Sequence, residues 1–470
     1  MPLPPASPSG KAALSRREVL SAGFLLAAAL CVLMDKVTGQ HGFALSSLVL
    51  VLGPVVTSWS RIKPLSRLMS ALTILATVVF YLTGGTLDAF LLAASRALFL
   101  PALLVTMTVL QVSAQSSEPV GLVARYVVDQ PPSRRFGMLA LAGHVFGILL
   151  NLAGYRFMLG VALEQCRRMS ADLRVREIQE RRIVNAVLCG FGATIMWSPV
   201  GIALNLLLPL MPNFDWIDYM PYGFAAMSGF IVLRYLFDRA GPRPVRARQP
   251  ASRTGVVMAA LQLMALLAGV TGSAALAEAI LGIPMQGALL IVIPLAAIIW
   301  RLRDGRCPAR GKLKDLAVRS FVAMPGPVNE VSLLLASGLL GLLLVELIPA
   351  DVVRGIVVSL DIPPAGLATA MVLFIAITSM IGISPMISGT VCVGAVLGAG
   401  IAIPYPMLLL AALTGWSAGM MISPVTATII VTSAVSGRPA SQIGLRWNGL
   451  FTLTYTAMMI GVFTVWGWLI

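Results

Sequence analysis

The tripeptide Ser-Pro-Val occurs twice, at 198–200 and at 423–425, each time in the middle of a long apolar stretch. Proline inside a helix removes one backbone hydrogen bond and clashes with the preceding turn, so each tripeptide predicts an interrupted helix. An interruption exposes backbone N–H and carbonyl groups beside the serine hydroxyl. Such groups can bind an ion or a small polar solute, but they supply no acid, base or metal ligand for a reaction.

The chain that carries these interruptions has the composition of a polytopic membrane protein. Of its 470 residues 58% are hydrophobic and 11% are charged, and the mean hydropathy is +0.90. A helix of roughly 20 apolar residues crosses a bilayer. The stretches of about that length are 19–34, 42–59, 66–84, 88–111, 219–237, 254–273, 284–300, 331–348 and 447–470, and two longer stretches, 183–211 and 405–436, contain the Ser-Pro-Val tripeptides.

The net charge of +15 reflects basic residues that gather in short loops. If the N-terminus is cytoplasmic, alternate loops on the cytoplasmic side hold 30 of the 34 Lys and Arg residues. This asymmetry follows the positive-inside rule. It predicts a multi-pass protein of the bacterial inner membrane with a cytoplasmic N-terminus and a periplasmic C-terminus, and it removes the need for a nucleic-acid partner. The five cysteines form no CxxC pair, so neither a metal site nor a disulfide framework is indicated.

The two halves of the chain share an internal repeat. Residues 190–200 and 415–425 have six identities in eleven positions, and Asp129-Gln-Pro-Pro upstream parallels Asp361-Ile-Pro-Pro. The offsets between the copies are 225 and 232 residues, and the number of spans before each copy differs by an odd number. The copies therefore face opposite ways, as in the inverted-topology repeats of many secondary transporters. The predicted divisions are 1–40 for the N-terminal tail and first span, 41–240 for repeat 1, 241–253 for a cytoplasmic linker and 254–470 for repeat 2.

Each repeat also contains an apolar segment that we expect to enter the membrane and return on the same side. Residues 138–162 have basic clusters on both flanks, and a crossing helix would leave one cluster outside. A re-entrant hairpin with its tip near Asn151 avoids this, and 365–398 is the matching hairpin of repeat 2. The predicted fold is an all-α polytopic membrane protein with about eleven transmembrane helices plus two re-entrant hairpins.

The candidate binding residues are the short polar, Gly and Pro residues of the hairpin tips and interrupted helices. No Asp or Glu lies in 138–162, 183–210, 365–398 or 405–436, so coordination of Na⁺ by carbonyl and hydroxyl oxygens is favoured over a proton relay. The segments and spans also contain charged or titratable residues. A packing role is favoured for His144 and snorkelling for Arg156. Arg96 is an intramembrane charge without an evident partner. The candidates are Asn151, Gly154, Thr194, Ser198, Pro199, Gly201, Asn205, Ser384, Pro385, Ser388, Gly389, Thr390, Ser423, Pro424, Thr426 and Thr428.

This combination resembles the ion transporter superfamily over nearly the whole chain. The spans, surface helices at 120–128 and 350–360, hairpins and interrupted helices look like the plan of the divalent anion/sodium symporters. That family typically has Ser-Asn-Thr at tips and breaks, whereas the Ser-Pro pairs here look closer to the large membrane subunit of tripartite periplasmic transporters. The resemblance implies a homodimer in which hairpins and interrupted helices slide as an elevator against a scaffold of the other spans.

The expected function is Na⁺-coupled transport of a small anionic solute such as a carboxylate, with the lipid bilayer as surroundings and no cofactor beyond Na⁺. The alternatives are a membrane subunit that needs a periplasmic solute-binding protein, or a proton-coupled anion exporter. An integral membrane enzyme is the third possibility, but only two histidines, His41 and His144, and no clustered carboxylates are present to stage a reaction.

Overall fold

The computed structural model describes residues 15–115, 117–128, 130–169, 172–241, 255–303 and 308–469, and this part of the chain contains helices and no strand. Asp129, which anchors the repeat in the sequence, and 242–253 of the predicted linker lie outside the described residues.

The helices follow one another along the chain with short connections. In the first half they are α1 Arg16–Thr38, α2 Gly42–Thr57, η1 Trp59–Arg61, α3 Pro64–Leu82, α4 Leu87–Gln115, α5 Glu118–Val128, α6 Pro132–Met169, α7 Leu173–Ala193, η2 Thr194–Met196, α8 Ile202–Leu207, η3 Leu208–Leu210 and α9 Trp216–Ala240. In the second half they are α10 Val256–Leu281, α11 Met285–Leu302, α12 Ala309–Ala323, α13 Val328–Leu347, α14 Ala350–Ser359, α15 Pro364–Met380, α16 Pro385–Gly398, α17 Tyr405–Ile422, α18 Ala427–Ser436, the π-helix η4 Gln442–Trp447 and α19 Asn448–Leu469.

Local sequence sets where these helices begin and end. Ser15 and Glu18 form a capping box at the start of α1, and Gly39 in the left-handed conformation (φ 69°) ends it. Proline occupies the first turn of α3, α15, α16 and α17, where its missing N–H has no intrahelical acceptor anyway. The apolar stretches predicted from the sequence therefore become helices with ordinary caps.

The number of apolar helices agrees with a multi-pass membrane protein. Ten helices of the described residues are long and apolar enough to cross a membrane, or eleven if α14 and α15, which meet at 119°, are counted as one span. This count includes α6 and leaves out α2, whose 16 residues are about 24 Å long at 1.5 Å per residue. The total is close to the eleven spans expected, but it includes α6, and its eleventh member includes α15, which were both expected to belong to re-entrant hairpins.

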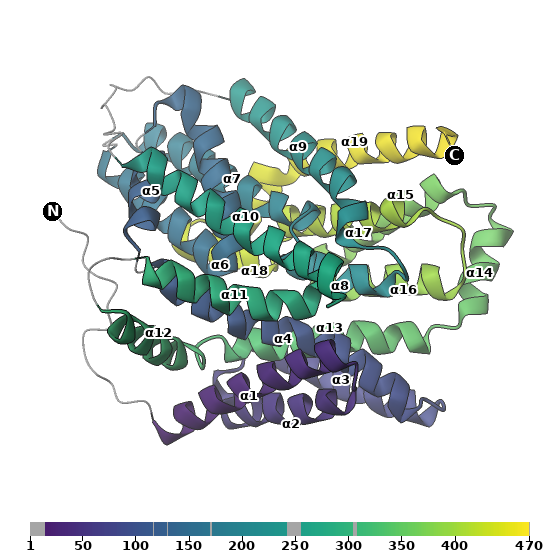
Figure 1. The fold of residues 1–470 in the computed structure, drawn as a ribbon. Helices are drawn as coiled ribbons and strands as arrows, with labels where there is room; N and C mark the ends of the chain where they lie inside the picture. Colours follow the sequence, from purple (N-terminus) through teal and green to yellow (C-terminus); the bar gives the residue numbers. More distant parts are fainter. Residues whose placement is uncertain are drawn as a thin grey trace.

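The helices form two groups that lie side by side (Figure 1). In one group α3 and α4 pack on α13, α11 packs on α4 and α10, and α1 packs on α2 and α4. In the other group α6 packs on α7, α15 packs on α17, and α19 packs on both α15 and α17. We call the first the outer group and the second, α6 to α9 with α15 to α19, the inner group. α1 begins at one end of the molecule and α19 ends at the opposite end.

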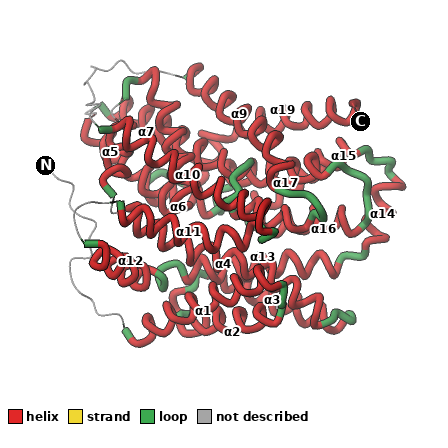
Figure 2. The backbone as a smooth tube through the Cα atoms, viewed as in Figure 1, coloured by secondary structure: helices red, strands yellow, loops and turns green. Residues whose placement is uncertain are grey.

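Two short amphipathic helices precede the segments predicted as hairpins. α5 packs on α6 and α10 through buried residues such as Val120 and Val127. α14 has no buried residue and lies at the edge of the molecule (Figure 2). These helices are the surface-lying runs expected at 120–128 and 350–360, and each leads the chain from the outer group into the inner group.

Candidate binding site

The first interruption follows α7 at the first Ser-Pro-Val. α7 ends at Ala193, one 3₁₀ turn follows, and the chain leaves helical geometry at 197–201 before α8 begins. Pro199 cannot donate a hydrogen bond, so carbonyl oxygens of this stretch need other partners. The buried side-chain amide of Asn205 donates to the carbonyls of Pro199 and, at 2.9 Å, of Gly201. Asn205 therefore stabilises the interruption rather than facing an open site.

The second interruption is the four-residue gap between α17 and α18. Here the hydroxyls of Ser423 and Thr426 donate hydrogen bonds to backbone carbonyls. Ser423 Oγ donates to the carbonyl of Ser379 at 2.6 Å, and Thr426 Oγ1 donates to that of Ser423 at 3.0 Å. Both predicted interruptions exist, and in the second one Ser423 is committed to holding α15 against the break.

α6 consists of two helical arms that meet at Asn151 and form a hairpin. Asn151 has φ 52° and ψ −142°, which no helix accommodates. The rings of Phe146 and Phe157 lie 6.2 Å apart, whereas eleven residues of straight helix would separate them by roughly 16 Å. Gly154 lies against the carbonyl of Phe146, 2.2 Å from where a Cβ would be, so only glycine permits this close return of the chain. The tip is at Asn151, as expected.

The second hairpin consists of α15, a turn at 381–384 and α16. Gly382 with φ 98° makes the turn, and Ser384 caps α16 by accepting a hydrogen bond from Met386 N at 3.3 Å. Ser388 was expected at the tip, but the helix has already resumed at Pro385 because proline suits the first helical position. Ser388 instead pairs with Thr378 of the opposite arm at 2.7 Å.

Each hairpin packs on the interrupted helix that follows it through a glycine. A Cβ on Gly190 of α7 would lie 1.9 Å from the carbonyl oxygen of Ala140 in the first hairpin. A Cβ on Gly415 of α17 would lie 3.0 Å from the carbonyl oxygen of Val372 in the second hairpin. The same close backbone contact therefore occurs in both halves of the chain.

The two halves also exchange contacts with each other. Tyr155 on the returning arm of the first hairpin bonds Thr432 of α18, with 2.5 Å between the hydroxyl oxygens. Gly389 of α16 lies next to Leu207 of α8, so the second hairpin in turn contacts the first interrupted helix. At the centre, Gly192 of α7 lies against the methyl group of Met420 in α17, and α17 also contacts the 3₁₀ turn η2 that leads into the first interruption. The two interrupted helices thus pack on each other just before their breaks.

Among the predicted hydroxyls of the described residues, Ser198 is exceptional. Its Oγ is buried and has no hydrogen-bond partner, and the residue is 1% exposed. By contrast, Thr194 and Thr390 donate to carbonyls of their own helices, at 2.7 and 2.8 Å. Unpaired buried hydroxyls are costly, so Ser198 is the residue of this group that calls for an additional partner.

The remaining candidates either bond to the nearby backbone or are only partly buried. Asn151 accepts a hydrogen bond from Leu152 N at 2.8 Å and is half-buried. Pro424 is half-buried and Thr428 is buried, with its carbonyl accepting from Thr432. Arg156, outside the list, is exposed.

Sequence reasoning missed an aromatic cluster beside Ser198. The indole N–H of Trp197 donates to Nε2 of His144 at 3.1 Å, so the histidine proton lies on Nδ1, which faces the carbonyl of Gly190 at 3.1 Å. Trp216 donates to the carbonyl of Trp197 at 2.9 Å. Both nitrogens of His144 are thus occupied, which gives it the packing role favoured from the sequence. The signal in the sequence was Trp197, directly before Ser198, because a buried indole N–H needs a hydrogen-bond acceptor.

Two amides of the outer group were also missed. Gln111 of α4 donates to the carbonyl of Leu150, next to the first hairpin tip, at 3.0 Å. Gln286 of α11 donates to the carbonyl of Asn205 at 2.8 Å. Elsewhere in the contact between the groups, α13 and α16 meet through small residues such as Gly341 and Thr390. For Arg96 of α4 the structure provides an electrostatic partner, Glu346 at the end of α13.

The sequence matches no family model and no curated protein. Among solved structures the chain is similar to the YdaH transporter of Alcanivorax borkumensis, whose crystal structure has an unusual topology. The two are 18% identical, the match covers 78% of this chain and 85% of that one, and the TM-score is 0.45.

Proposed function

We propose that this protein is a secondary active transporter that moves a small anionic solute, such as a carboxylate, across the bacterial inner membrane. The observation that carries the proposal is the contact between two interrupted helices, each backed by its own hairpin, with the unpaired hydroxyl of Ser198 in the first interruption. In a bilayer, non-helical backbone is tolerated where protein buries it or where it lines a polar cavity. Two such places in contact are typical of a solute site near the midplane.

An inverted-topology repeat is part of this proposal. Gly190 and Gly415 are separated by the 225 residues of the Ser-Pro-Val copies, and their contact partners Ala140 and Val372 by the 232 residues of the Asp-x-Pro-Pro copies. The two contacting pairs are therefore related by the same offsets as the two repeated sequence motifs, which supports a structural repeat. The opposite placement of the start of α1 and the end of α19 suits an odd number of crossings, with a cytoplasmic N-terminus and a periplasmic C-terminus.

An anionic solute and Na⁺ coupling fit the chemistry of the four segments. The N-terminal ends of α16 and α18 point toward the breaks from Ser384 and Thr426, and helix N-termini favour negative charge. The segments contain no Asp or Glu, so proton relay through carboxylates has no candidate there. Carbonyl and hydroxyl oxygens are suitable Na⁺ ligands. For the same reason we propose transport rather than enzymatic catalysis.

We further propose that the inner group moves as an elevator against the outer group, within a homodimer. The contact between α13 and α16 is built from small and apolar residues, and a smooth surface of this kind favours sliding. The described hydrogen bonds of Gln111 and Gln286 to backbone carbonyls would be exchanged during the movement.

The test is uptake into proteoliposomes that contain the purified chain. Dicarboxylates, keto acids, sulfonates and oxyanions are supplied in turn, with and without an inward Na⁺ gradient. We expect at least one carboxylate to accumulate only with the gradient. Absence of uptake for every anion in both conditions contradicts the proposal, and Na⁺-independent uptake contradicts the coupling. If uptake appears only after adding a periplasmic solute-binding protein, the tripartite alternative is supported instead.

A further inference from the structure

A second feature of the inner group lies away from the interruptions: the buried guanidinium of Arg234. Arg234 lies near the end of α9 and is 4% exposed. Its Nε is buried without a hydrogen-bond partner, and no ion pair of Arg234 occurs among the described residues. The guanidinium lies over the ring of Phe451 in α19, whose centroid is 4.9 Å from the guanidinium carbon. A buried charge without a counter-ion is strongly unfavourable, so a partner is required.

Asp238, one turn further along α9, attracts Arg234 electrostatically but forms no ion pair with it among the described residues. Its two oxygens instead bind Arg182 of α7, at 2.9 and 2.6 Å. Arg181 adds a further positive charge that acts on Arg234. The local charge is therefore positive, and an anion is the complement that this region lacks.

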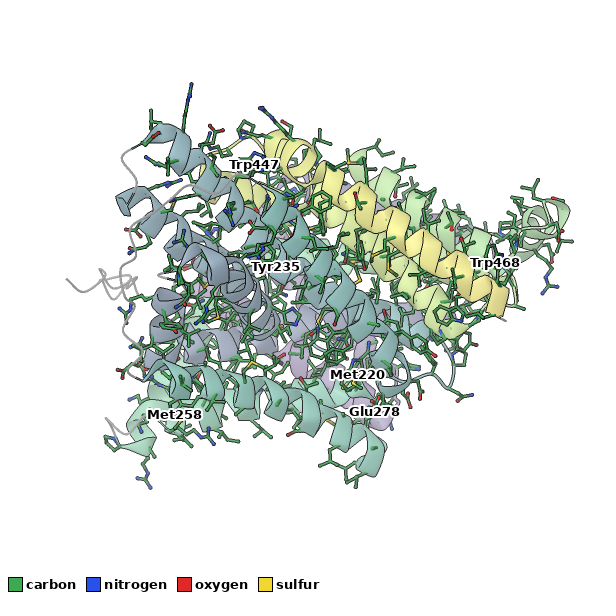
Figure 3. The ribbon with its side chains drawn as sticks, turned by 90° about the horizontal axis from the view of Figure 1, so that it is seen from above. Met220, Tyr235, Met258, Glu278, Trp447 and Trp468 are labelled. Atoms are coloured by element: carbon green, nitrogen blue, oxygen red, sulfur yellow. The ribbon has the colours of Figure 1, made fainter. Side chains whose placement is uncertain are left out.

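Two further orphan atoms belong to helices of the same junction, α7 and α19. Asn185 of α7 has a buried Oδ1 without a partner, and it lies one helical turn from Arg181, whose positive charge acts on Arg234. Asn448 of α19, one turn before Phe451, has a fully buried Oδ1 without a partner. α9 contacts both α7 and α19. Figure 3 shows the end of α9 at Tyr235 beside the start of α19 at Trp447.

The three buried atoms without partners, one donor at Arg234 and two acceptors at Asn185 and Asn448, indicate the chemistry of the ligand. An anion accepts the N–H of the guanidinium but cannot satisfy the amide oxygens. Water bound to the anion can donate to those oxygens. A small, hydrated carboxylate therefore suits the junction better than water alone, which leaves the positive charge unbalanced, or than a dry anion.

Buried side chains of α19 connect this junction with the first interruption. The guanidinium of Arg234 lies over the ring of Phe451, which stacks on the ring of Tyr455 with 6.4 Å between the centroids. The hydroxyl of Tyr455 contacts the sulfur of Met196 at 3.8 Å, and Met196 is two residues before Ser198. Packed aromatic side chains thus link the junction with the segment that carries the unpaired hydroxyl.

We propose that Arg234, Asn185 and Asn448 form a second anion site, which binds a small carboxylate on its way between the interruptions and the end of the molecule where α9 finishes. This inference rests on the proposed transport function and adds a site to it. A resident inorganic anion such as chloride has the same charge, and the experiment separates the two sources.

The experiment measures the thermal unfolding midpoint Tm of the full chain in lipid nanodiscs. Sodium acetate, pyruvate, succinate or chloride is added to a sodium HEPES buffer at equal ionic strength. At about a hundredfold excess over Kd, we expect a carboxylate to raise the Tm of the wild type by roughly 3 °C. Arg234→Met should lose the part of this rise that the Arg234 site supplies and keep at least the wild-type Tm in HEPES alone, because it removes an unbalanced buried charge. Arg234→Lys, which keeps the charge, should retain part of the rise.

The control is Arg446→Met, an exposed arginine of the π-helix η4, which should keep the whole rise. If Arg234→Met shows the same carboxylate-dependent rise as the wild type, the site is overturned. It is also overturned if chloride raises the wild-type Tm and none of the carboxylates does. An equal loss of Tm in every buffer also overturns it, because Arg234 would then act only in packing.

The two proposals can fail separately. If Ser198→Ala abolishes uptake while Arg234→Met retains both uptake and the carboxylate-dependent rise, the interruptions remain the transport site and the Arg234 site falls. If Ser198→Ala leaves uptake unchanged while Arg234→Met still loses the rise, the Arg234 site stands and the assignment of Ser198 falls.

Discussion

Replacing Ser198 and Ser423 separately by alanine tests whether equivalent residues of the two repeats have different roles. The Ser198 hydroxyl is buried without a partner, and an orphan hydroxyl costs about 1–3 kcal/mol. Ser198→Ala removes that cost, so we expect stability to rise by about 1 kcal/mol. Ser423→Ala removes a 2.6 Å hydrogen bond to the carbonyl of Ser379, which still accepts from Gly382 N at 3.2 Å. That carbonyl keeps one partner, so the loss should be about 1 kcal/mol.

The two variants should therefore shift Tm in opposite directions. At about 2.1 cal/mol/K per residue, the entropy of unfolding of this chain is on the order of 1 kcal/mol/K, so each shift is about 1 °C. Differential scanning fluorimetry in nanodiscs resolves this difference when both variants are compared with the wild type in one plate.

Uptake should separate the same variants more widely. A hydrogen bond to a charged solute contributes about 1.5–3 kcal/mol, so Ser198→Ala should lower kcat/KM for the transported anion by roughly 10- to 100-fold. Ser423→Ala should lower it less, through loosening of the second hairpin. If Ser198→Ala loses as much stability as Ser423→Ala, the hydroxyl has a structural partner and the reasoning is refuted. Normal uptake by Ser198→Ala removes it from the site.

Three other substitutions follow from the packing. Gly190→Ala places a methyl group on the carbonyl of the facing hairpin arm and should cost more than about 3 kcal/mol, seen as loss of folded protein in size-exclusion chromatography, whereas Gly137→Ala, with open space at its Cβ, should not. Trp197→Phe leaves Nε2 of His144 without its donor and should lower stability by about 1–3 kcal/mol in thermal unfolding; an unchanged Tm would show that the indole N–H contributes nothing. Gln286→Leu removes a hydrogen bond between the groups and, if their movement limits the rate, should raise the maximal uptake rate about two- to tenfold, while an unchanged rate argues against movement at this contact.

Much of the fold was predictable because its determinants are local. Pro199 and Pro424 each remove a backbone hydrogen bond and so disfavour a continuous helix. Pro54, Pro101 and Pro294 nevertheless lie inside helices, so it was the duplicated Ser-Pro-Val that marked these two positions as interruptions. The turn at Asn151 was predictable from charge, because basic residues on both flanks of 138–162 exclude a simple crossing. These predictions needed no knowledge of packing.

The role of each hydroxyl was not predictable, because it depends on which carbonyl faces it in three dimensions. Ser198 and Ser423 are equivalent in the repeat, yet only Ser423 meets a carbonyl of its hairpin. Arg234 lies at the basic end of the predicted span 219–237, and the positive-inside rule cannot distinguish a loop arginine from one buried a turn earlier. Such differences arise from tertiary contacts between distant segments.

The small-residue contact between α13 and α16 has a consequence for how membrane composition acts on this protein. Gly341 faces Thr390, and Gly394 faces Val345, so neutral surfaces meet along this part of the boundary. Relative displacement of the two groups there changes dispersion contacts and lipid packing while leaving charge pairs untouched. Turnover should accordingly respond to acyl-chain length and membrane fluidity, and only weakly to the salt content of the buffer.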